Sequence, residues 1–225
     1  MHNYIRPLVE LFRQNANAEN AAPMAKYMKN LFPYLGIKTP QRRELLKQFF
    51  KEYGVPEISY IKQIILDLWE LPEREFQYCA VGILRKFSKK LDKEMIDLFE
   101  YLIVHKSWWD TVDGLACWLV GNHFKRFPEF IRPYTEKWMK SGNMWLQRTV
   151  ILFQLDYKEK TDVELLFENI KKCTGSKEFF IQKAIGWALR EYSKTDEAIV
   201  IDFVENNKLA SLSKRESLKR LKKKI

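Results

Sequence analysis

The stretch Lys106-Ser107-Trp108-Trp109-Asp110-Thr111-Val112-Asp113-Gly114 combines the start of a helix with aromatic and acidic side chains. Ser107 followed three residues later by Asp110 predicts a capping box, with Ser107 at the N-cap. Asp113 comes four residues after Trp109, so the two side chains share a helix face. The buried stripe of this helix is predicted to consist of Val112, Leu115, Ala116 and Leu119. Trp109 and Asp113 then lie together at its edge, where the rim of a groove would be.

Helical periodicity extends outward from this stretch, and no segment shows the strict alternation of a half-buried strand. With only eight Gly and eight Pro, helix boundaries are sparsely marked. Thr39-Pro40 begins a helix that Gly54 ends, and Pro72 separates two more. N-caps of later helices are predicted at Ser107, Asn143, Ser176 and Ser213. The chain is therefore predicted to be all-α, with roughly a dozen helices joined by short loops.

The helices repeat with a spacing of 35 residues. In this register three glutamines align, namely Gln77, Gln147 and Gln182. Small residues align at Cys79, Gly114, Thr149 and Ala184, each followed by an apolar residue at Ala80, Leu115, Val150 and Ile185. Small residues at one height let helix backbones approach closely, as stacked helix pairs require. The register favours a superhelical solenoid of antiparallel helix pairs, and a compact irregular helical domain is the alternative.

The same register aligns a row of polar and aromatic side chains, which are Arg43, Tyr78, Asp113, Arg148 and Lys183. In a stack of helix pairs, one helix of each pair lines the concave face. We therefore expect this row to project into a concave groove.

Composition favours one domain over residues 1–225, because 225 residues that are 46% hydrophobic can bury a core without a metal or disulfide. The formal charge of +10 suggests a polyanionic partner. The basic tail, residues 213–225, contributes +6 of this charge and leaves +4 for the rest. A basic tail is more often a solvated helix end than a binding element, so charge alone is weak support for nucleic acid.

Several other classes of protein lack support in the sequence. Three distant cysteines without a C-x-x-C pattern argue against a disulfide framework and a zinc site. No H-E-x-x-H pattern, Walker A sequence, G-x-S-x-G or G-x-G-x-x-G is present, so we expect no metal and no cofactor. Residues 1–20 are too polar for a signal peptide, and no apolar run is long enough for a membrane span. We expect a reduced, cytoplasmic protein that does not bind membranes.

Two side chains stand out by their position on predicted helices. Arg148 lies in a segment that is apolar almost all round, so it must either pair with Asp113 or another acid, or contact phosphate. Trp187 points away from the apolar stripe of its helix and is flanked by Lys183 and Arg190. An indole between two cations suits recognition of a backbone or a cationic group. Packing of Trp187 against the next repeat is the alternative.

At these residues the chain resembles the AlkD family of bacterial DNA alkylation repair glycosylases, which are built from HEAT-like repeats. The resemblance rests on four stretches, Lys106–Asp113, Trp145–Arg148, Lys177–Trp187 and Pro23–Asn30. It implies excision of N3-methyladenine and N7-methylguanine from duplex DNA that lies along the concave face. It also implies that the damaged base is not flipped into a pocket, unlike in glycosylases generally.

Carried over by position, the resemblance implies that Asp113 is the catalytic carboxylate and that Trp109 and Trp187 flank the deoxyribose of the lesion. Arg148 is then a DNA contact essential for activity. The remaining DNA-binding residues are expected to be Lys183, Arg190, Tyr27, Thr39 and Arg43. Lys38 and Asp156 depart from the residue types expected at those positions. We expect a monomer that is associated with the bacterial nucleoid when bound to DNA.

The chemistry fits these residue types, because an N3- or N7-alkylated purine is already cationic and needs no general acid to leave. An ionised aspartate and indole faces can stabilise the oxocarbenium-like sugar, and one carboxylate supplies about 3 kcal/mol. A catalytically silent HEAT-like module that binds distorted or branched DNA is the alternative function. A protein-binding helical scaffold is a third, and it would show no salt-dependent DNA affinity.

Overall fold

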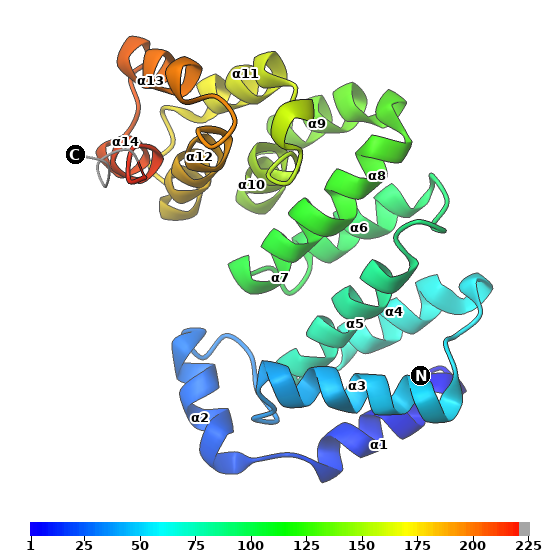
Figure 1. Cartoon of the computed structure of the whole chain (residues 1–225). Coiled ribbons are helices and arrows are strands. Elements are labelled where there is room, and N and C mark those ends of the chain that lie inside the picture. The colour runs from blue at the N-terminus through cyan, green and yellow to red at the C-terminus, as the bar shows by residue number, and fades with distance from the viewer. Residues whose placement is uncertain (221–225) are drawn as a thin grey trace. The chain divides into compact units, whose positions relative to one another are not determined.

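The computed structural model describes residues 1–220, and every regular element among them is helical (Figure 1). The prediction of an all-α chain is therefore confirmed. The chain divides after Leu91 into two compact units, and each is described by itself. The single domain predicted for residues 1–225 stays a prediction, as does the superhelical solenoid with a concave face. Within residues 1–220 no helix is both long and apolar enough to cross a membrane.

The first unit contains five α-helices, α1 to α5. They are α1 (Arg6–Gln14), α2 (Ala18–Tyr27), α3 (Thr39–Tyr53), α4 (Ile61–Glu70) and α5 (Arg74–Phe87). The predicted boundaries hold, since α3 begins at Thr39 and ends against Gly54, whose φ of 73° few other residues adopt. Pro72 lies between α4 and α5, which pack against each other.

The second unit contains the remaining α-helices of the described chain. They are α6 (Met95–Val104), α7 (Trp109–Gly114), α8 (Gly121–Arg126), α9 (Ile131–Lys140), α10 (Met144–Leu152), α11 (Val163–Cys173), α12 (Phe179–Tyr192), α13 (Glu197–Asn206) and α14 (Ser211–Ser217). Its core includes the apolar stripes of α10 and α12, which pack together, and α12 also packs closely against α14.

Five helices begin at intervals of 35 residues, which is the spacing found in the sequence. They are α3, α5, α7, α10 and α12, starting at residues 39, 74, 109, 144 and 179. The aligned small and apolar residues on the last four are all buried. The side-chain amide of each aligned glutamine donates to a backbone carbonyl that precedes its own helix. Gln77 donates to carbonyls at the end of α4, Gln147 to the carbonyl of Met139 in α9, and Gln182 to the carbonyl of Ser176.

Of the predicted N-caps on later helices, Asn143 is confirmed, because its side chain accepts the N–H groups of Trp145 and Leu146. The other two predictions on α12 and α14 are wrong. Glu178 precedes α12, and the hydroxyl of Ser176 accepts the Glu178 N–H instead. Ser213 lies inside α14, where its hydroxyl donates to the carbonyl of Gln182 on α12 at 2.9 Å. A tertiary bond to α12 thus replaces the cap.

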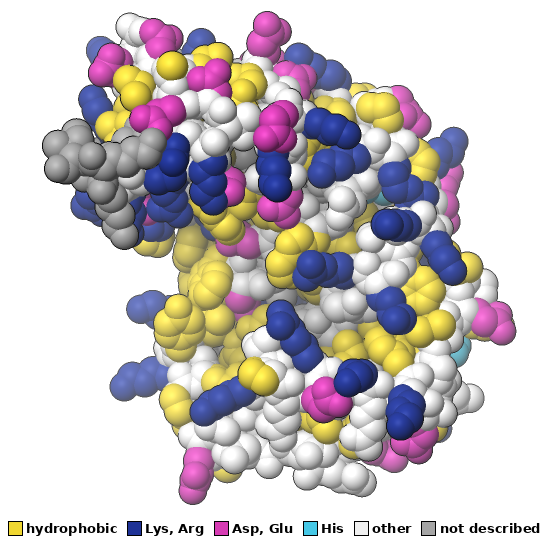
Figure 2. Space-filling model, viewed as in Figure 1, with side chains coloured by type: hydrophobic (Ala, Val, Ile, Leu, Met, Phe, Trp, Pro, Cys, Tyr) yellow, Lys and Arg dark blue, Asp and Glu magenta, His cyan; other side chains and the backbone are white. Residues whose placement is uncertain are grey.

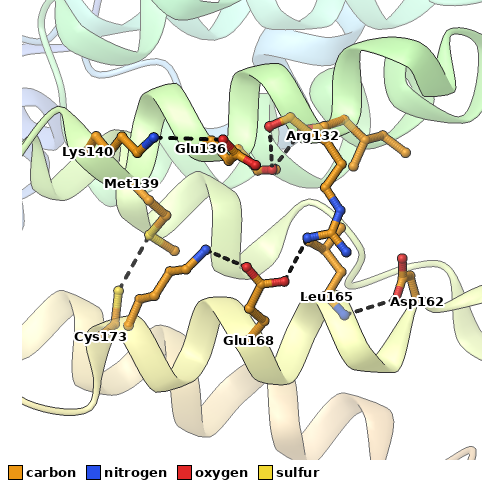
Figure 3. A network of polar contacts seen from close by, with 11 residues as sticks. Arg132, Glu136, Met139, Lys140, Asp162, Leu165, Glu168 and Cys173 are labelled. Atoms are coloured by element: carbon orange, nitrogen blue, oxygen red, sulfur yellow. Dashed lines mark hydrogen bonds and ion pairs between the residues drawn. The ribbon is translucent and has the colours of Figure 1, made fainter.

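Helices α9 and α11 are connected by polar side chains (Figure 3). Arg132 donates to Glu168 at 2.7 Å, and Lys172 donates to the other oxygen of Glu168 at the same distance. Nearby the thiol of Cys173 meets the sulfur of Met139 at 3.7 Å. Exposed ion pairs contribute little to stability, so the buried apolar core contributes most to holding this unit together.

A π-helical segment, Leu115–Val120, joins α7 to α8 in one continuous helix. The N–H of Gly121 bonds to the carbonyl of Ala116 five residues earlier. A side chain at Gly121 would collide with the carbonyl of Phe153, because its Cβ would lie 2.4 Å from that oxygen. Tyr157 donates to the Gly121 carbonyl at 2.6 Å. The helix that carries Asp113 is therefore held closely against the end of α10.

Candidate active site

Helix α7 begins at Trp109 rather than after a capped Ser107. The hydroxyl of Ser107 donates to the Ile103 carbonyl at 2.6 Å, and Asp110 accepts the N–H of Thr111 at 3.0 Å. The predicted capping box is therefore wrong, because Ser107 satisfies an orphan carbonyl at the end of α6 instead of an N–H of α7.

Asp113 and Arg148 form a bidentate ion pair between α7 and α10. The Nε of Arg148 donates to Oδ1 of Asp113 at 2.7 Å, and its Nη2 donates to Oδ2 at 2.9 Å. This fork is the strongest geometry available to a guanidinium and a carboxylate. Of the two alternatives that the sequence left open for Arg148, the ion pair with Asp113 is therefore present.

The third contact of Arg148 ties α12 into the same site. Its Nη1 donates to the backbone carbonyl of Phe180 at 2.5 Å, and the guanidinium lies 5.9 Å from the centre of the Phe180 ring. Only 5% of Arg148 is exposed, so these contacts satisfy a charge that would otherwise be buried at high cost. Arg148 thus joins three helices of the repeat at one point.

An aromatic cluster lies beside this ion pair and consists of Trp108, Trp145 and Phe180. The ring centre of Phe180 is 5.0 Å from that of Trp108 and 5.1 Å from that of Trp145. No role was predicted for Phe180 or Trp145 from the sequence. Their separation of 35 residues was the available signal, because it places them at equivalent positions of α12 and α10.

The environment of Asp113 acts on its charge in two opposite ways. Burial raises the pKa of Asp113 above the ordinary value of an aspartate, while the hydrogen bonds and positive charge of Arg148 oppose that rise. Arg148 occupies one lone pair on each carboxylate oxygen, and 18% of the side chain remains exposed. A carboxylate has about four acceptor positions. Asp113 therefore keeps acceptor capacity for a further positive group.

The two indoles of the predicted site are both partly buried. Trp109 is the first residue of α7, one turn before Asp113 on the same face. Trp187 lies on α12, seven residues after Phe180 and so about 10 Å further along the helix axis. It packs partly against the core of the second unit, while the predicted stripe beside it is largely buried. Trp187 therefore packs in part, as one of the two alternatives has it, and its role in recognition stays a prediction.

The cations on either side of Trp187 have an acidic partner that the sequence analysis missed. Glu216 on α14 accepts from Arg190 at 2.9 Å and pairs with Lys183 at 3.2 Å. The positive charge of these two residues holds the pKa of Glu216 below its usual range, against the effect of its burial. Figure 2 shows the same mixture more widely, with basic and acidic side chains interspersed over helices of the second unit.

Three predicted DNA-binding residues lie in the first unit, and all are exposed. Tyr27 is the last residue of α2 and is 71% exposed. Thr39 is the first residue of α3, where backbone N–H groups are free of helical partners, and Arg43 follows one turn later. Lys38 is the N-cap of α3 and makes no side-chain cap. These positions suit an anion at the start of α3.

A cavity of about 140 Å³ in the second unit lies apart from these residues. None of the predicted site residues lines it. Its walls are Ile151, Gln154, Leu155, Lys158, Glu159, Thr161, Leu166, Ala188, Glu191, Tyr192, Lys194 and Thr195.

Comparison with known proteins identifies the family of this chain. The family model described as DNA alkylation repair enzyme matches residues 8–221. A solved structure described as a predicted DNA alkylation repair enzyme from Enterococcus faecalis is similar, with 34% identity and a TM-score of 0.85. The match covers 92% of this chain and 96% of that one. A search of curated proteins gives no match. The resemblance noted in the sequence is confirmed at this level, and the chain belongs to the family of DNA alkylation repair enzymes.

Proposed function

We propose that this protein is a monofunctional DNA glycosylase that excises cationic alkylated purines, N3-methyladenine and N7-methylguanine, from duplex DNA. The observation that carries the proposal is the Asp113–Arg148 ion pair, which leaves a fixed and partly exposed carboxylate one turn after Trp109. Membership of a DNA alkylation repair family supports alkylated DNA as the substrate. The product would be an abasic site that enters base excision repair.

The proposed mechanism relies on charge stabilisation rather than on proton donation. Alkylation at N3 or N7 makes the purine cationic, so the glycosidic bond breaks with the base as a neutral leaving group. Positive charge then develops on the deoxyribose, where the carboxylate of Asp113 stabilises it. The π-faces of Trp109 and Trp187 add a further attraction for that charge. Asp113 also positions the attacking water.

Arg148 serves this mechanism through Asp113. Its fork uses one acceptor position on each oxygen and fixes the plane of the carboxylate. Its positive charge also counters the rise in the pKa of Asp113 caused by burial. Arg148 therefore favours the ionised form of the carboxylate and fixes its orientation, whether or not it also contacts phosphate, as the family resemblance implies.

The DNA contacts of the proposal come from Lys183 and Arg190 in the second unit and from Tyr27, Thr39 and Arg43 in the first. Basic side chains and helix N-termini bind phosphates without reading sequence, as a lesion-repair enzyme requires. We include in the proposal that the damaged base remains outside any protein pocket. In keeping with this, the cavity of about 140 Å³ is lined by none of the proposed site residues.

The test is a chromatogram of bases released from methylated duplex DNA, with and without the purified protein. We expect N7-methylguanine and N3-methyladenine to appear faster than in buffer alone. Affinity for the same duplex is measured in parallel. If the protein binds the duplex but releases no more base than buffer does, the alternative of a silent module for distorted DNA replaces the proposal.

A further inference from the structure

The basic C-terminal segment contains one acidic residue, Glu216, and the fold buries it. Neighbouring Lys214, Arg215 and Lys219 are exposed, whereas only 11% of the Glu216 side chain is. A buried carboxylate in such a segment requires partners, because leaving it unpaired would be costly. Its partners are Lys183 and Arg190 on α12, which use different oxygens of the carboxylate.

The contact between α12 and α14 depends on a glycine. A Cβ at Gly186 would lie 2.5 Å from the Cβ of Glu216 and 3.0 Å from the carbonyl of Ser213. Ser213 adds a hydrogen bond to the carbonyl of Gln182 in the same region. The absence of a side chain at Gly186 therefore allows the Glu216 carboxylate to reach between the two cations.

These two cations are proposed phosphate contacts, and Trp187 lies between them in the sequence of α12. The ion pairs reduce their combined charge from +2 to +1. Because Glu216 is held by the packing of α14, a phosphate that approaches either cation must compete with a fixed carboxylate. Competition of this kind reduces the number of phosphates neutralised on binding, and with it the affinity for any duplex.

We propose that Glu216 limits the affinity of the protein for the DNA backbone by holding Lys183 and Arg190 in ion pairs. This inference rests on the proposed function, since it assumes that the surface around Trp187 meets duplex DNA. Its effect is to lower sequence-independent affinity without removing the cations that flank the proposed site.

The experiment measures the affinity of the full chain for a short undamaged duplex over a series of salt concentrations. In Glu216→Gln we expect affinity at low salt to rise about three- to tenfold. We also expect the slope of log affinity against log salt to steepen by about 0.9 for each phosphate gained. The matched control is Glu191→Gln, which also removes one negative charge, in this case on α12. The cation that loses its partner is then Lys194 and not Lys183 or Arg190. The slope of Glu191→Gln should stay at the wild-type value.

A second variant tests whether the gain depends on a cation that Glu216 holds. In a double-mutant cycle, Lys183→Gln should remove part of the gain in slope that Glu216→Gln produces. An unchanged slope in Glu216→Gln, a slope equal to that of the Glu191 control, or no duplex binding by any variant would overturn the inference. Base release by the wild type is measured separately. If the wild type releases no base but the salt slope of Glu216→Gln is steeper, the proposed glycosylase activity is rejected and the role of Glu216 is retained.

Discussion

Each unit of the molecule has a carboxylate on one of the repeated helices, Glu75 on α5 and Asp113 on α7, and the two are used differently. Glu75 is fully buried and accepts three backbone N–H groups, from Leu35, Gly36 and Ile37, at 2.9 to 3.1 Å. Asp113 accepts only from Arg148 among the bonds described above, and part of its side chain is exposed. Glu75 fixes a loop, whereas Asp113 has acceptor capacity left over.

Burial and pairing alone therefore do not distinguish a carboxylate that fixes a loop from one that keeps free acceptor positions. Both groups are held in place, but the oxygens of Glu75 are occupied by the chain that leads into α3. The position on α5 that corresponds to Asp113 is Tyr78, whose hydroxyl lies 2.9 Å from that of Tyr34. Substitutions at these positions should therefore separate effects on base release from effects on folding.

The largest effect is expected for Asp113→Asn. Removing the charge that stabilises the sugar cation should slow base release by about a hundredfold, or about 3 kcal/mol. Single-turnover release from methylated duplex measures it, normalised to the folded fraction because Arg148 loses its ionised partner. The matched control is Asp110→Asn, one turn earlier on α7, which should keep release within about threefold of wild type. Release by Asp113→Asn at the rate of that control would remove Asp113 from the mechanism.

Glu75→Gln should affect folding rather than chemistry. An amide can accept with only one oxygen, so at least one of the three backbone N–H groups loses its partner. The free energy of unfolding should fall by about 2 kcal/mol, measured by urea denaturation. Release per folded molecule should not change. A hundredfold loss of release with unaltered stability would contradict the distinction drawn between the two carboxylates.

Arg148→Lys should move the pH dependence of release. In the proposed mechanism the active form is the ionised carboxylate, so the rate should fall as pH drops through the pKa of folded Asp113. A lysine is a point charge without the fork, so it opposes the effect of burial less and the pKa rises further. The acid limb of the single-turnover profile should shift to higher pH, with less than about a tenfold loss above it. A uniform loss at every pH, together with weaker duplex binding, would instead assign Arg148 to phosphate contact.

The smallest effect is expected for Tyr78→Phe, at the position equivalent to Asp113 in the first unit. Loss of the hydroxyl contact with Tyr34 should lower the free energy of unfolding by about 1 kcal/mol, measured by denaturation. Base release should be unchanged. A marked loss of release would show that this position shares in the chemistry.

Much of the fold was predictable because it depends on local pattern. The spacing of 35 residues, the start of α3 at Thr39 and the N-cap at Asn143 follow from apolar periodicity and backbone preferences. Ser107 and Ser213 were misassigned because each hydroxyl bonds to a carbonyl of another helix, α6 and α12 respectively. The partner of Ser213 is a tertiary one that local pattern does not indicate, whereas Ser107 has a local choice between the end of α6 and the start of α7.

The candidate site was predictable in the same limited way. Residues on one helix, such as Trp109 and Asp113, could be related by helical spacing. The Asp113–Arg148 pair followed only as one of two alternatives, because both lie on the repeat register. Glu216 could not be assigned, since nothing in the sequence indicates that α14 returns to α12 across Gly186. Long-range packing decides which charges meet.

The π-helical segment after Asp113 affects how this helix responds to a change in its number of residues, as distinct from a change in residue type. Removing one residue between Leu115 and Val120 would let an ordinary α-helix form, because a π-turn holds about one residue more than an α-turn over nearly the same rotation. His123 and Phe124, both buried on α8, would then keep nearly their present face, whereas a deletion within α10 or α12 would turn the rest of that helix by about 100°. The chain should accordingly tolerate the loss of one residue from this segment better than the loss of one from α10 or α12.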